Sequence, residues 1–283
     1  MGNHLFQYCL ARILALNLRF CLPPHPIQGF PATFQEVPGA NFSHGPVQYV
    51  YQNADLEDVL SDPTRRKIVL CGSFERYRYY RAYKDFIRHD WLQTDIPLEG
   101  QVSESDVIIG VRRRDMLYYN SLLPFSYFEE ALGRIRYRRV FITSDDFSSP
   151  FLRKFNKFDP VFVRTDALKA FRFMMQFKKI IISVSTFQWW SAFLSNAEQI
   201  YMPQPMEGLW CRQHQPEIDL WVDDEDRYTL IPCRERYGLT LTETIRYQYK
   251  RKFKPYLSRT IVTRIKKIKV FRSIIQSLKA IFG

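Results

Sequence analysis

Three consecutive arginines, Arg112 to Arg114, are the residues of this sequence whose chemistry is most specific. They follow the apolar run 107–111 directly, and Asp115 comes after them. A guanidinium group keeps its charge and offers a planar fork of donors, so paired arginines are suited to binding a diphosphate. We therefore predict that Asp106–Asp115 is a buried strand that ends in a diphosphate site. The residues also leave open a simpler interpretation, a basic turn exposed to solvent.

Two further polar clusters follow apolar runs in the same way. Ser144-Asp145-Asp146 comes after the run 139–143, and Ser183-Val184-Ser185-Thr186 comes after the run 179–182. The carboxyl ends of parallel strands share one edge of a sheet, where open α/β folds bind their ligands. We expect the three clusters to converge there into a nucleotide site, with a helix N-terminus after Ser185 directed at a phosphate. Taken singly, either cluster could instead cap the helix that follows it.

The elements that must position these clusters follow an α/β pattern. Strands are predicted at 106–111, 139–143, 161–163, 179–182 and 200–202, and the helices between them at 125–137, 166–177 and 187–195. This alternation predicts a parallel, doubly wound sheet. The preceding part is predicted to hold a buried helix at 2–20 capped by Asn3, an irregular segment at 21–65, a strand at 67–71, helical spacing at 73–91 and a linker within 95–104. Of the adjacent Trp189 and Trp190, at least one is expected in the core.

The charge of the chain is concentrated at its end. The 283 residues carry a net charge of +12, with 41 basic and 29 acidic residues, and 46% of them are hydrophobic. Residues 244–283 contain no Asp or Glu and hold the whole basic excess. The body is therefore neutral, which argues against a nucleic-acid-binding body. Within the tail, apolar residues recur at helical spacing from 259 to 283, which is typical of a basic amphipathic helix on an anionic membrane surface. A helix packed on the body or on a protein partner, and RNA binding, are the alternatives.

The remaining composition favours a cytoplasmic protein without a metal site. The five cysteines are scattered and form no CxxC pair, which fits a reducing compartment. The five histidines form no cluster with ligand spacing. No stretch has the length and apolar character of a membrane span or of a signal peptide. We therefore expect a cytoplasmic protein that is peripheral on the membrane through its tail.

Five motifs, in order, resemble those of the alpha-1,2-fucosyltransferases. The opening Gly2-Asn3-His4-Leu5-Phe6-Gln7-Tyr8-Cys9 with Ala11-Arg12 resembles GNQxFQYAxAR, and Gly72-Ser73-Phe74-Glu75-Arg76 resembles G-[YF]-F-Q. Gly110-Val111-Arg112-Arg113-Arg114-Asp115 resembles H-V-R-R-G-D, and Phe141-Ile142-Thr143-Ser144-Asp145-Asp146 resembles F-x-S-D-D. The segment from Ser183 to Ala192 is similar to N-S-[ST]-F-S-W-W-A-A. The resemblance covers residues 1 to about 235 and leaves the tail outside.

This resemblance implies a GT-B arrangement of two Rossmann-like domains with parallel sheets. Residues 1–98 would be the acceptor-side domain, residues 99–243 the GDP-fucose-binding domain, and residues 244–283 the basic tail. Because the sequence begins at the predicted helix, the comparison with the family leads us to expect that the first strand of the N-terminal domain and its glycine-rich turn are missing. The reaction implied is inverting transfer of L-fucose from GDP-fucose to a galactoside hydroxyl of an oligosaccharide or glycolipid, forming an alpha-1,2 linkage without a metal or other cofactor.

The resemblance also implies roles for individual residues. Arg112 and Arg113 would hold the diphosphate and stabilise the departing GDP. The other residues carried over are those expected at the guanosine, at the phosphates and on the first domain's side of the cleft: Ser144, Asp145 and Asp146; Ser185, Thr186 and Phe187; Gly2, Asn3 and Gln7. The catalytic candidates are Arg113, Asp115 and His4. Asp115 would act as the catalytic base or orient Arg113 through a salt bridge. His4 would act as the base, or it would have a packing or helix-capping role.

Two departures from the family pattern bear on activity. The His that heads the arginine motif is Gly110 in this chain, and the Gly before the aspartate is Arg114. Two alternatives therefore stay open beside a galactoside 2-alpha-L-fucosyltransferase. One is a related transferase of different linkage or donor, and the other is a non-catalytic nucleotide- or glycan-binding descendant.

Overall fold

The larger sheet of the protein has the strand order of a Rossmann fold. The computed structural model describes residues 1–40, 45–62, 66–95, 97 and 100–248. Six parallel strands lie in the order β5-β4-β3-β6-β7-β8. They are β3 (Val107–Val111), β4 (Val140–Ser144), β5 (Val161–Phe162), β6 (Lys179–Ile181), β7 (Gln199–Gln204) and β8 (Tyr228–Pro232). The chain winds outward first from β3 and then from β6, so the switch point lies between these two strands. The predicted parallel α/β architecture is thereby confirmed.

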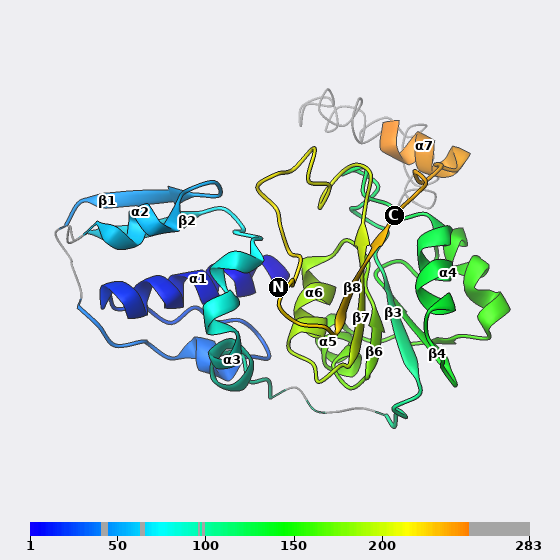
Figure 1. Cartoon of the computed structure of the whole chain (residues 1–283), viewed down its shortest axis with the longest axis horizontal. Helices are drawn as coiled ribbons and strands as arrows, with labels where there is room; N and C mark the ends of the chain where they lie inside the picture. Colours follow the sequence, from blue (N-terminus) through cyan, green and yellow to red (C-terminus); the bar gives the residue numbers. More distant parts are fainter. Residues whose placement is uncertain (41–44, 63–65, 96, 98–99, 249–283) are drawn as a thin grey trace, which may run out of the picture.

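Helices cover both faces of this sheet. Helix α4 (Phe125–Gly133) and the 3-10 helix η5 (Pro150–Phe158) lie on one face, and α5 (Ala167–Met174) and α6 (Thr186–Phe193) lie on the other (Figure 1). Every residue of β3 is buried, which explains its continuous apolar sequence. Ile109 packs into the core on the α4 side, and Ile108 packs into the core that contains α6. Each such buried side chain contributes about 1.5–3 kcal/mol to stability.

The residues before the large sheet form a smaller unit around a long helix. Helix α1 (Gly2–Leu18) is followed by the short 3-10 helix η1 (Pro31–Phe34), strand β1 (Val47–Tyr51), helix α2 (Leu56–Ser61) and strand β2 (Lys67–Cys71). The strands β1 and β2 form a two-stranded parallel sheet. The N-terminal end of α1 points toward the large sheet and α6 (Figure 1).

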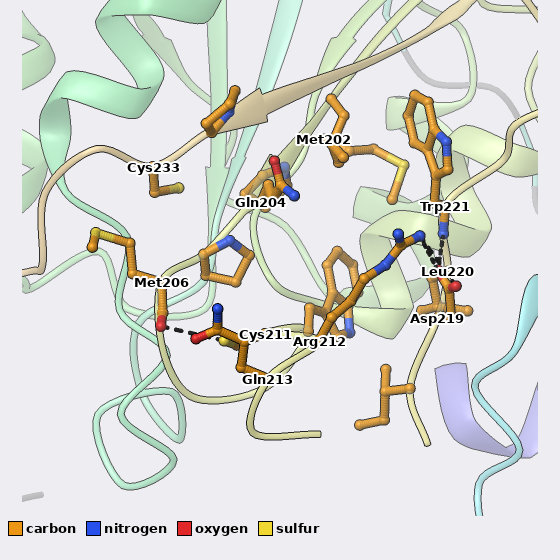
Figure 2. A pocket seen from close by; sticks show the side chains of 16 residues that line it. Met202, Gln204, Met206, Cys211, Arg212, Gln213, Asp219, Leu220, Trp221 and Cys233 are labelled. Atoms are coloured by element: carbon orange, nitrogen blue, oxygen red, sulfur yellow. Dashed lines mark hydrogen bonds and ion pairs between the residues drawn. The ribbon is translucent and has the colours of Figure 1, made fainter. Parts of the chain in front are cut away.

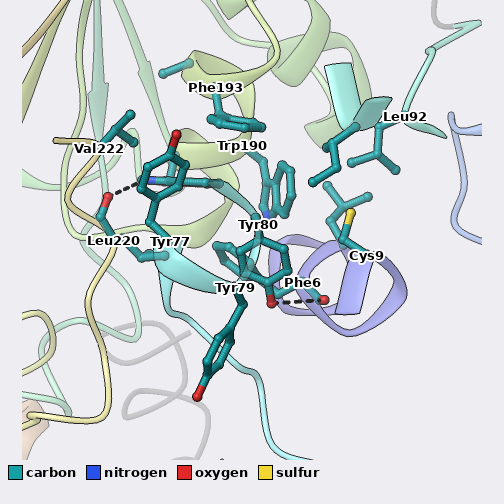
Figure 3. Packing of buried hydrophobic residues seen from close by; sticks show 14 of the residues in the cluster. Phe6, Cys9, Tyr77, Tyr79, Tyr80, Leu92, Trp190, Phe193, Leu220 and Val222 are labelled. Carbon is teal, nitrogen blue, oxygen red and sulfur yellow. Dashed lines mark hydrogen bonds between the residues drawn. The ribbon is translucent and has the colours of Figure 1, made fainter. Parts of the chain in front are cut away.

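A buried aromatic cluster fixes α1 against α6. The Phe6 ring lies 5.1 Å from the Trp189 ring and 4.8 Å from the Trp190 ring, measured between centroids. Tyr80 donates hydrogen bonds from its hydroxyl to the carbonyl oxygens of Phe6 and Phe74 at 3.2 and 2.8 Å. Figure 3 shows Phe6, Tyr80 and Trp190 gathered at this junction. Both tryptophans are fully buried, which confirms that at least one belongs to the core.

Ion pairs add a second link between the two parts of the chain. Asp224 accepts hydrogen bonds from the Tyr77 hydroxyl at 2.7 Å and from Lys84 Nζ at 2.9 Å. Glu225 pairs with Arg88 at 2.7 Å. The segment that supplies these partners consists of short turns: η2 (Tyr77–Tyr79), η3 (Arg81–Tyr83), α3 (Lys84–Phe86) and the π-helical turn η4 (Ile87–Trp91). Residues 73–91 therefore form a series of short helical turns and not one continuous helix.

The structure corrects several predicted elements. The segment 21–65 is not irregular, because it contains β1 and α2. Asn3 does not cap α1, because Met1 holds the N-cap position. Strand β8 was not predicted at all. Helix α7 (Leu241–Gln248) crosses the boundary predicted after residue 243, and the helix predicted at 259–283 lies outside the described residues. Across the described ranges, no helix combines the length and apolar character that crossing a membrane requires.

Candidate active site

A cavity of about 580 Å³ lies where the carboxyl edge of the large sheet meets the start of α1. Its position beside β3 and β6 is the switch point, where doubly wound sheets bind their ligands. We call it the switch-point cavity. Most of the residues predicted for the site line it: Gly2, Asn3, His4, Arg112, Asp115, Ser185, Thr186 and Phe187.

Two helix N-termini converge on this cavity. A Cβ atom added at Gly2 would lie 2.4 Å from Thr186 Oγ1 and 2.7 Å from the Phe187 nitrogen, so glycine is required at this approach of α1 to α6. Thr186 Oγ1 donates to Asn3 Oδ1 at 2.8 Å across the same junction. Ser185 is the N-cap of α6, and its side chain accepts from the Gln188 backbone. The first N–H groups of a helix lack intrahelical partners and carry partial positive charge, so this junction attracts an anion.

Arg112 adds a full positive charge to the same wall. Its Nε and Nη2 atoms donate to the two carboxylate oxygens of Asp115 at 3.0 and 2.9 Å, and Nε lies 3.3 Å from Asp145. Its backbone nitrogen donates to Ser183 Oγ at 3.2 Å. Asp115 contacts both Nε and Nη2, and Asp145 contacts Nε, so Nη1 is the guanidinium nitrogen left for a ligand among the contacts that the described residues make. Asp115 therefore orients Arg112, not Arg113 as the sequence suggested.

Arg113 lies in a different place from the one predicted. Its side chain is 4% exposed and does not line the cavity. Arg113 Nη2 donates to Glu243 Oε1 at 2.5 Å and to the Tyr237 hydroxyl at 2.6 Å, and its guanidinium lies 4.1 Å from the centre of the Phe151 ring. The structure therefore does not bring Arg113 to the cavity with Arg112, and a contact of Arg113 with a diphosphate stays a prediction. Arg113 instead holds α7 against the strand tips.

The cluster after β4 shapes the arginine loop and does not line the cavity. Asp145 accepts hydrogen bonds from the backbone nitrogens of Arg113 and Arg114 at 2.7 and 3.1 Å, and burial raises the pKa of its carboxyl. Ser144 Oγ donates to the Val111 carbonyl at 2.8 Å, and Asp146 accepts from the Ser148 backbone at 3.1 Å. These contacts fix the backbone around Arg112. Direct contact of this cluster with guanosine stays a prediction.

Gln7 and His4 occupy different positions along α1. Gln7 Nε2 donates to the Gly72 carbonyl at 2.8 Å, which joins α1 to the end of β2 and keeps Gln7 out of the cavity lining. His4 lines the cavity, and its ring centre lies 6.0 Å from that of His25. Partial burial and the neighbouring positive charges lower the pKa of His4. The lowered pKa favours the neutral form of its imidazole.

A side chain from α6 fills the space beside Gly110, the glycine that heads the arginine motif. A Cβ atom added at Gly110 would lie 2.3 Å from Gln188 Cδ. Gln188 is 4% exposed, and its Oε1 accepts from the Ser183 backbone nitrogen at 2.6 Å. Ser183 Oγ donates in turn to the Gly110 carbonyl at 2.6 Å. The Gln188 carboxamide thus occupies the space that any side chain at position 110 would need, and it supports the backbone that carries Arg112.

Glu75 is a site residue that the sequence did not single out. It is 7% exposed and lines the switch-point cavity together with Ser73 and Trp210. Burial raises the pKa of its carboxyl. The other carboxylate in the lining, Asp115, is paired with Arg112. A lone glutamate in a segment rich in arginine and tyrosine belongs to no recognisable pattern of spacing. Because Glu75 replaces the Gln of the family motif, a role of its carboxylate would be specific to this chain.

These features define a Rossmann-like α/β protein with a cavity at its switch point, lined by Arg112 and by the N-termini of α1 and α6. A family model described as glycosyl transferase family 11 matches residues 48–207. The chain belongs to this family, the alpha-1,2-fucosyltransferases. No curated protein and no solved structure matched the chain. Membership supports a glycosyltransferase, and specifically a fucosyltransferase.

Proposed function

We propose that this chain transfers L-fucose from GDP-fucose to a galactoside hydroxyl of an oligosaccharide or glycolipid. The linkage formed would be alpha-1,2 and the reaction inverting, in a GT-B arrangement of two Rossmann-like domains. The observation that carries the proposal is the convergence of the N-termini of α1 and α6 with Arg112 on one cavity. That combination suits the diphosphate of a nucleotide sugar better than a neutral ligand.

The residues of the cleft have distinct tasks in this reaction. Arg112 and the backbone N–H groups at Thr186 and Phe187 bind the diphosphate and stabilise the charge that develops on departing GDP. Asp115 and Asp145 hold Arg112 in place before the donor arrives, so little reorganisation accompanies the transfer. Fixed positive groups would stabilise the charge on the departing diphosphate, as a divalent cation does in other transferases. The absence of a metal requirement is part of the proposal.

One observation favours a second candidate function. Gln188 fills the space beside Gly110, so the imidazole of the family motif is replaced by a carboxamide that supports the backbone. A chain that has lost a catalytic His in this way could bind the nucleotide or glycan without turnover. The non-catalytic descendant is therefore the alternative that must be tested directly.

A transfer assay separates the two candidates. The purified chain is incubated with GDP-fucose and lactose, product is detected by mass spectrometry, and the linkage is determined by NMR. We expect fucosyllactose with an alpha-1,2 bond, and none with Arg112→Ala. GDP binding without any fucosylated product would support the non-catalytic candidate instead, and another linkage would support a related transferase.

For the C-terminal residues, we propose that the basic tail 244–283 binds an anionic membrane surface on the cytoplasmic side. The support is the sequence alone: basic residues on an apolar period and no acidic residue. A lipid-linked acceptor would then lie close to the enzyme. Helix α7, which is held by Arg113, connects this tail to the donor loop.

A further inference from the structure

A second cavity lies beside the switch-point cavity. It has a volume of about 350 Å³ and sits at the carboxyl ends of β7 and β8, under the long loop that joins these strands (Figure 2). Trp210 and Ile218 line both cavities, so they form the partition between them. We call this second space the tryptophan cavity.

The walls of the tryptophan cavity combine flat apolar surfaces with a polar rim. The half-buried indoles of Trp210 and Trp221 contribute the flat surfaces. Arg212 Nη2 lies 3.0 and 3.1 Å from the two carboxylate oxygens of Asp219, and Asp219 also accepts from the Trp221 backbone at 3.3 Å. Figure 2 shows this Arg212–Asp219 pair beside Trp221 at the edge of the cavity. A pyranose ring presents C–H groups on one face and hydroxyls around its rim, so such walls match a sugar.

The partition is held in place by an unusual backbone. Trp210 has φ 66°, in the left-handed region that side-chain-bearing residues rarely adopt. Two residues earlier, Gly208 has φ 75°, and a Cβ atom there would lie 2.3 Å from the Asn120 carbonyl oxygen. The surrounding structure must therefore impose this conformation, and strained residues of this kind cluster at functional sites.

Glu75 stands at the junction of the two cavities. It lines the switch-point cavity together with Trp210, which also lines the tryptophan cavity. The charged or titratable side chains that share this lining are His4, Arg112, Asp115 and Tyr119. Asp115 is paired with Arg112, whereas Glu75 forms no ion pair with any of the described residues.

We propose that the tryptophan cavity binds the galactoside acceptor, and that Glu75 is the base that deprotonates its attacking hydroxyl. The galactose ring stacks on the indoles with one hydroxyl directed past Trp210 toward the donor. The oxygen of that hydroxyl forms a bond to C1 of fucose, the bond from C1 to the phosphate oxygen breaks, and GDP leaves with the electron pair. The hydroxyl proton passes to the Glu75 carboxylate and from there to solvent. This inference rests on the proposed fucosyl transfer.

Two variants test the two parts of the acceptor site. Trp221→Ala should raise KM for lactose at least tenfold with an unchanged Kd for GDP, and Trp221→Phe should retain most of the affinity. Glu75→Gln should lower kcat at least a hundredfold, in the range expected for loss of a general base, while Kd for GDP and KM for lactose change less than threefold. Glu75→Asp should recover part of the rate. In the wild type, kcat should fall on acidification as Glu75 becomes protonated.

Controls separate this proposal from folding and from the proposed function. GDP affinity and Tm report folding of each variant, and Tyr137→Ala removes an exposed aromatic side chain outside both cavities. An unchanged KM for lactose in Trp221→Ala overturns the proposal, and so does a wild-type kcat in Glu75→Gln. If the wild type binds GDP but transfers no fucose, the proposed function fails. Saturation-transfer NMR with lactose then tests the cavity alone, and equal signals from the wild type and Trp221→Ala refute it.

Discussion

Substitution of Gly110 by alanine is the most sensitive probe of the donor loop. The added Cβ would lie 2.3 Å from Gln188 Cδ and 2.6 Å from both amide heteroatoms. The carboxamide is buried, so it can move only by breaking the bond from the Ser183 nitrogen to Gln188 Oε1, now 2.6 Å. Overpacking of a buried site costs about 1–3 kcal/mol, and an unsatisfied buried N–H costs about 1–3 kcal/mol. We expect Gly110→Ala to lose roughly 3 kcal/mol of unfolding free energy.

A double-mutant cycle shows whether the clash is the cause. Gln188→Ala alone removes the acceptor of the Ser183 nitrogen and should destabilise by about 1–3 kcal/mol. In Gly110→Ala/Gln188→Ala the added methyl group has room. The loss of unfolding free energy in the double variant should therefore be smaller than the sum of the two single losses by about 1–3 kcal/mol. Urea unfolding of the wild type and the three variants measures each term.

The same cycle carries a functional readout. Because Ser183 supports the Arg112 backbone, GDP affinity should fall in Gly110→Ala and recover in part in the double variant. The family pattern supplies a second pair, since it has His at position 110 and Ser at position 188. Gly110→His should destabilise the chain, and Gly110→His/Gln188→Ser should be tolerated better. A Gly110→Ala variant within about 0.5 kcal/mol of the wild type, or strictly additive effects, would refute this reasoning.

Three further predictions concern the loop, the core and the tail. Arg113→Ala should lower the unfolding free energy by about 3 kcal/mol, because it leaves Glu243 without its buried partner; Arg114→Ala, at an exposed position, is the matched control, and equal stabilities in urea unfolding would contradict the assignment. Hydrogen bonds from Arg139 hold the pKa of Asp106 below its ordinary value, so the carboxylate stabilises the fold above its unfolded pKa and this contribution is lost as pH falls below about 4. Asp106→Asn should flatten that acid dependence, and a wild-type dependence in the variant would count against it. Removal of residues 249–283, which spares α7, should abolish flotation with anionic vesicles and leave GDP affinity unchanged; equal flotation of both chains would exclude the tail as the membrane anchor.

The inner strands of the large sheet were predictable because they are mainly buried, whereas the edge strand β8 is only partly buried and was missed. Strand β3 has no polar residue between 107 and 111, and all five residues are buried, so the sequence carried a clear signal. Strand β1 was missed because Tyr49 and Tyr51 are more than half exposed and the strand belongs to a two-stranded sheet among Pro and Gly residues. No run of buried apolar residues marks it.

The site was predictable in part for a related reason. Arg112, Ser185 and Thr186 follow directly after β3 and β6, so topology alone brings them to one edge. The direction of the Arg113 side chain could not be predicted in this way, because its partner Glu243 lies far along the chain. Glu75 and Trp210 also meet only through the tertiary fold, and neither stands in a pattern of spacing that local reasoning can detect.

Calorimetric titration of GDP into the wild type, Arg112→Ala and Arg114→Ala tests the central assignment of the switch-point cavity most directly. Loss of a charge-assisted hydrogen bond costs about 1.5–3 kcal/mol. The Kd of Arg112→Ala should therefore rise roughly 10- to 150-fold, whereas Arg114→Ala should bind GDP like the wild type. Equal affinity of Arg112→Ala and the wild type, or no GDP binding by the wild type, would contradict the assignment of this cavity as the donor site.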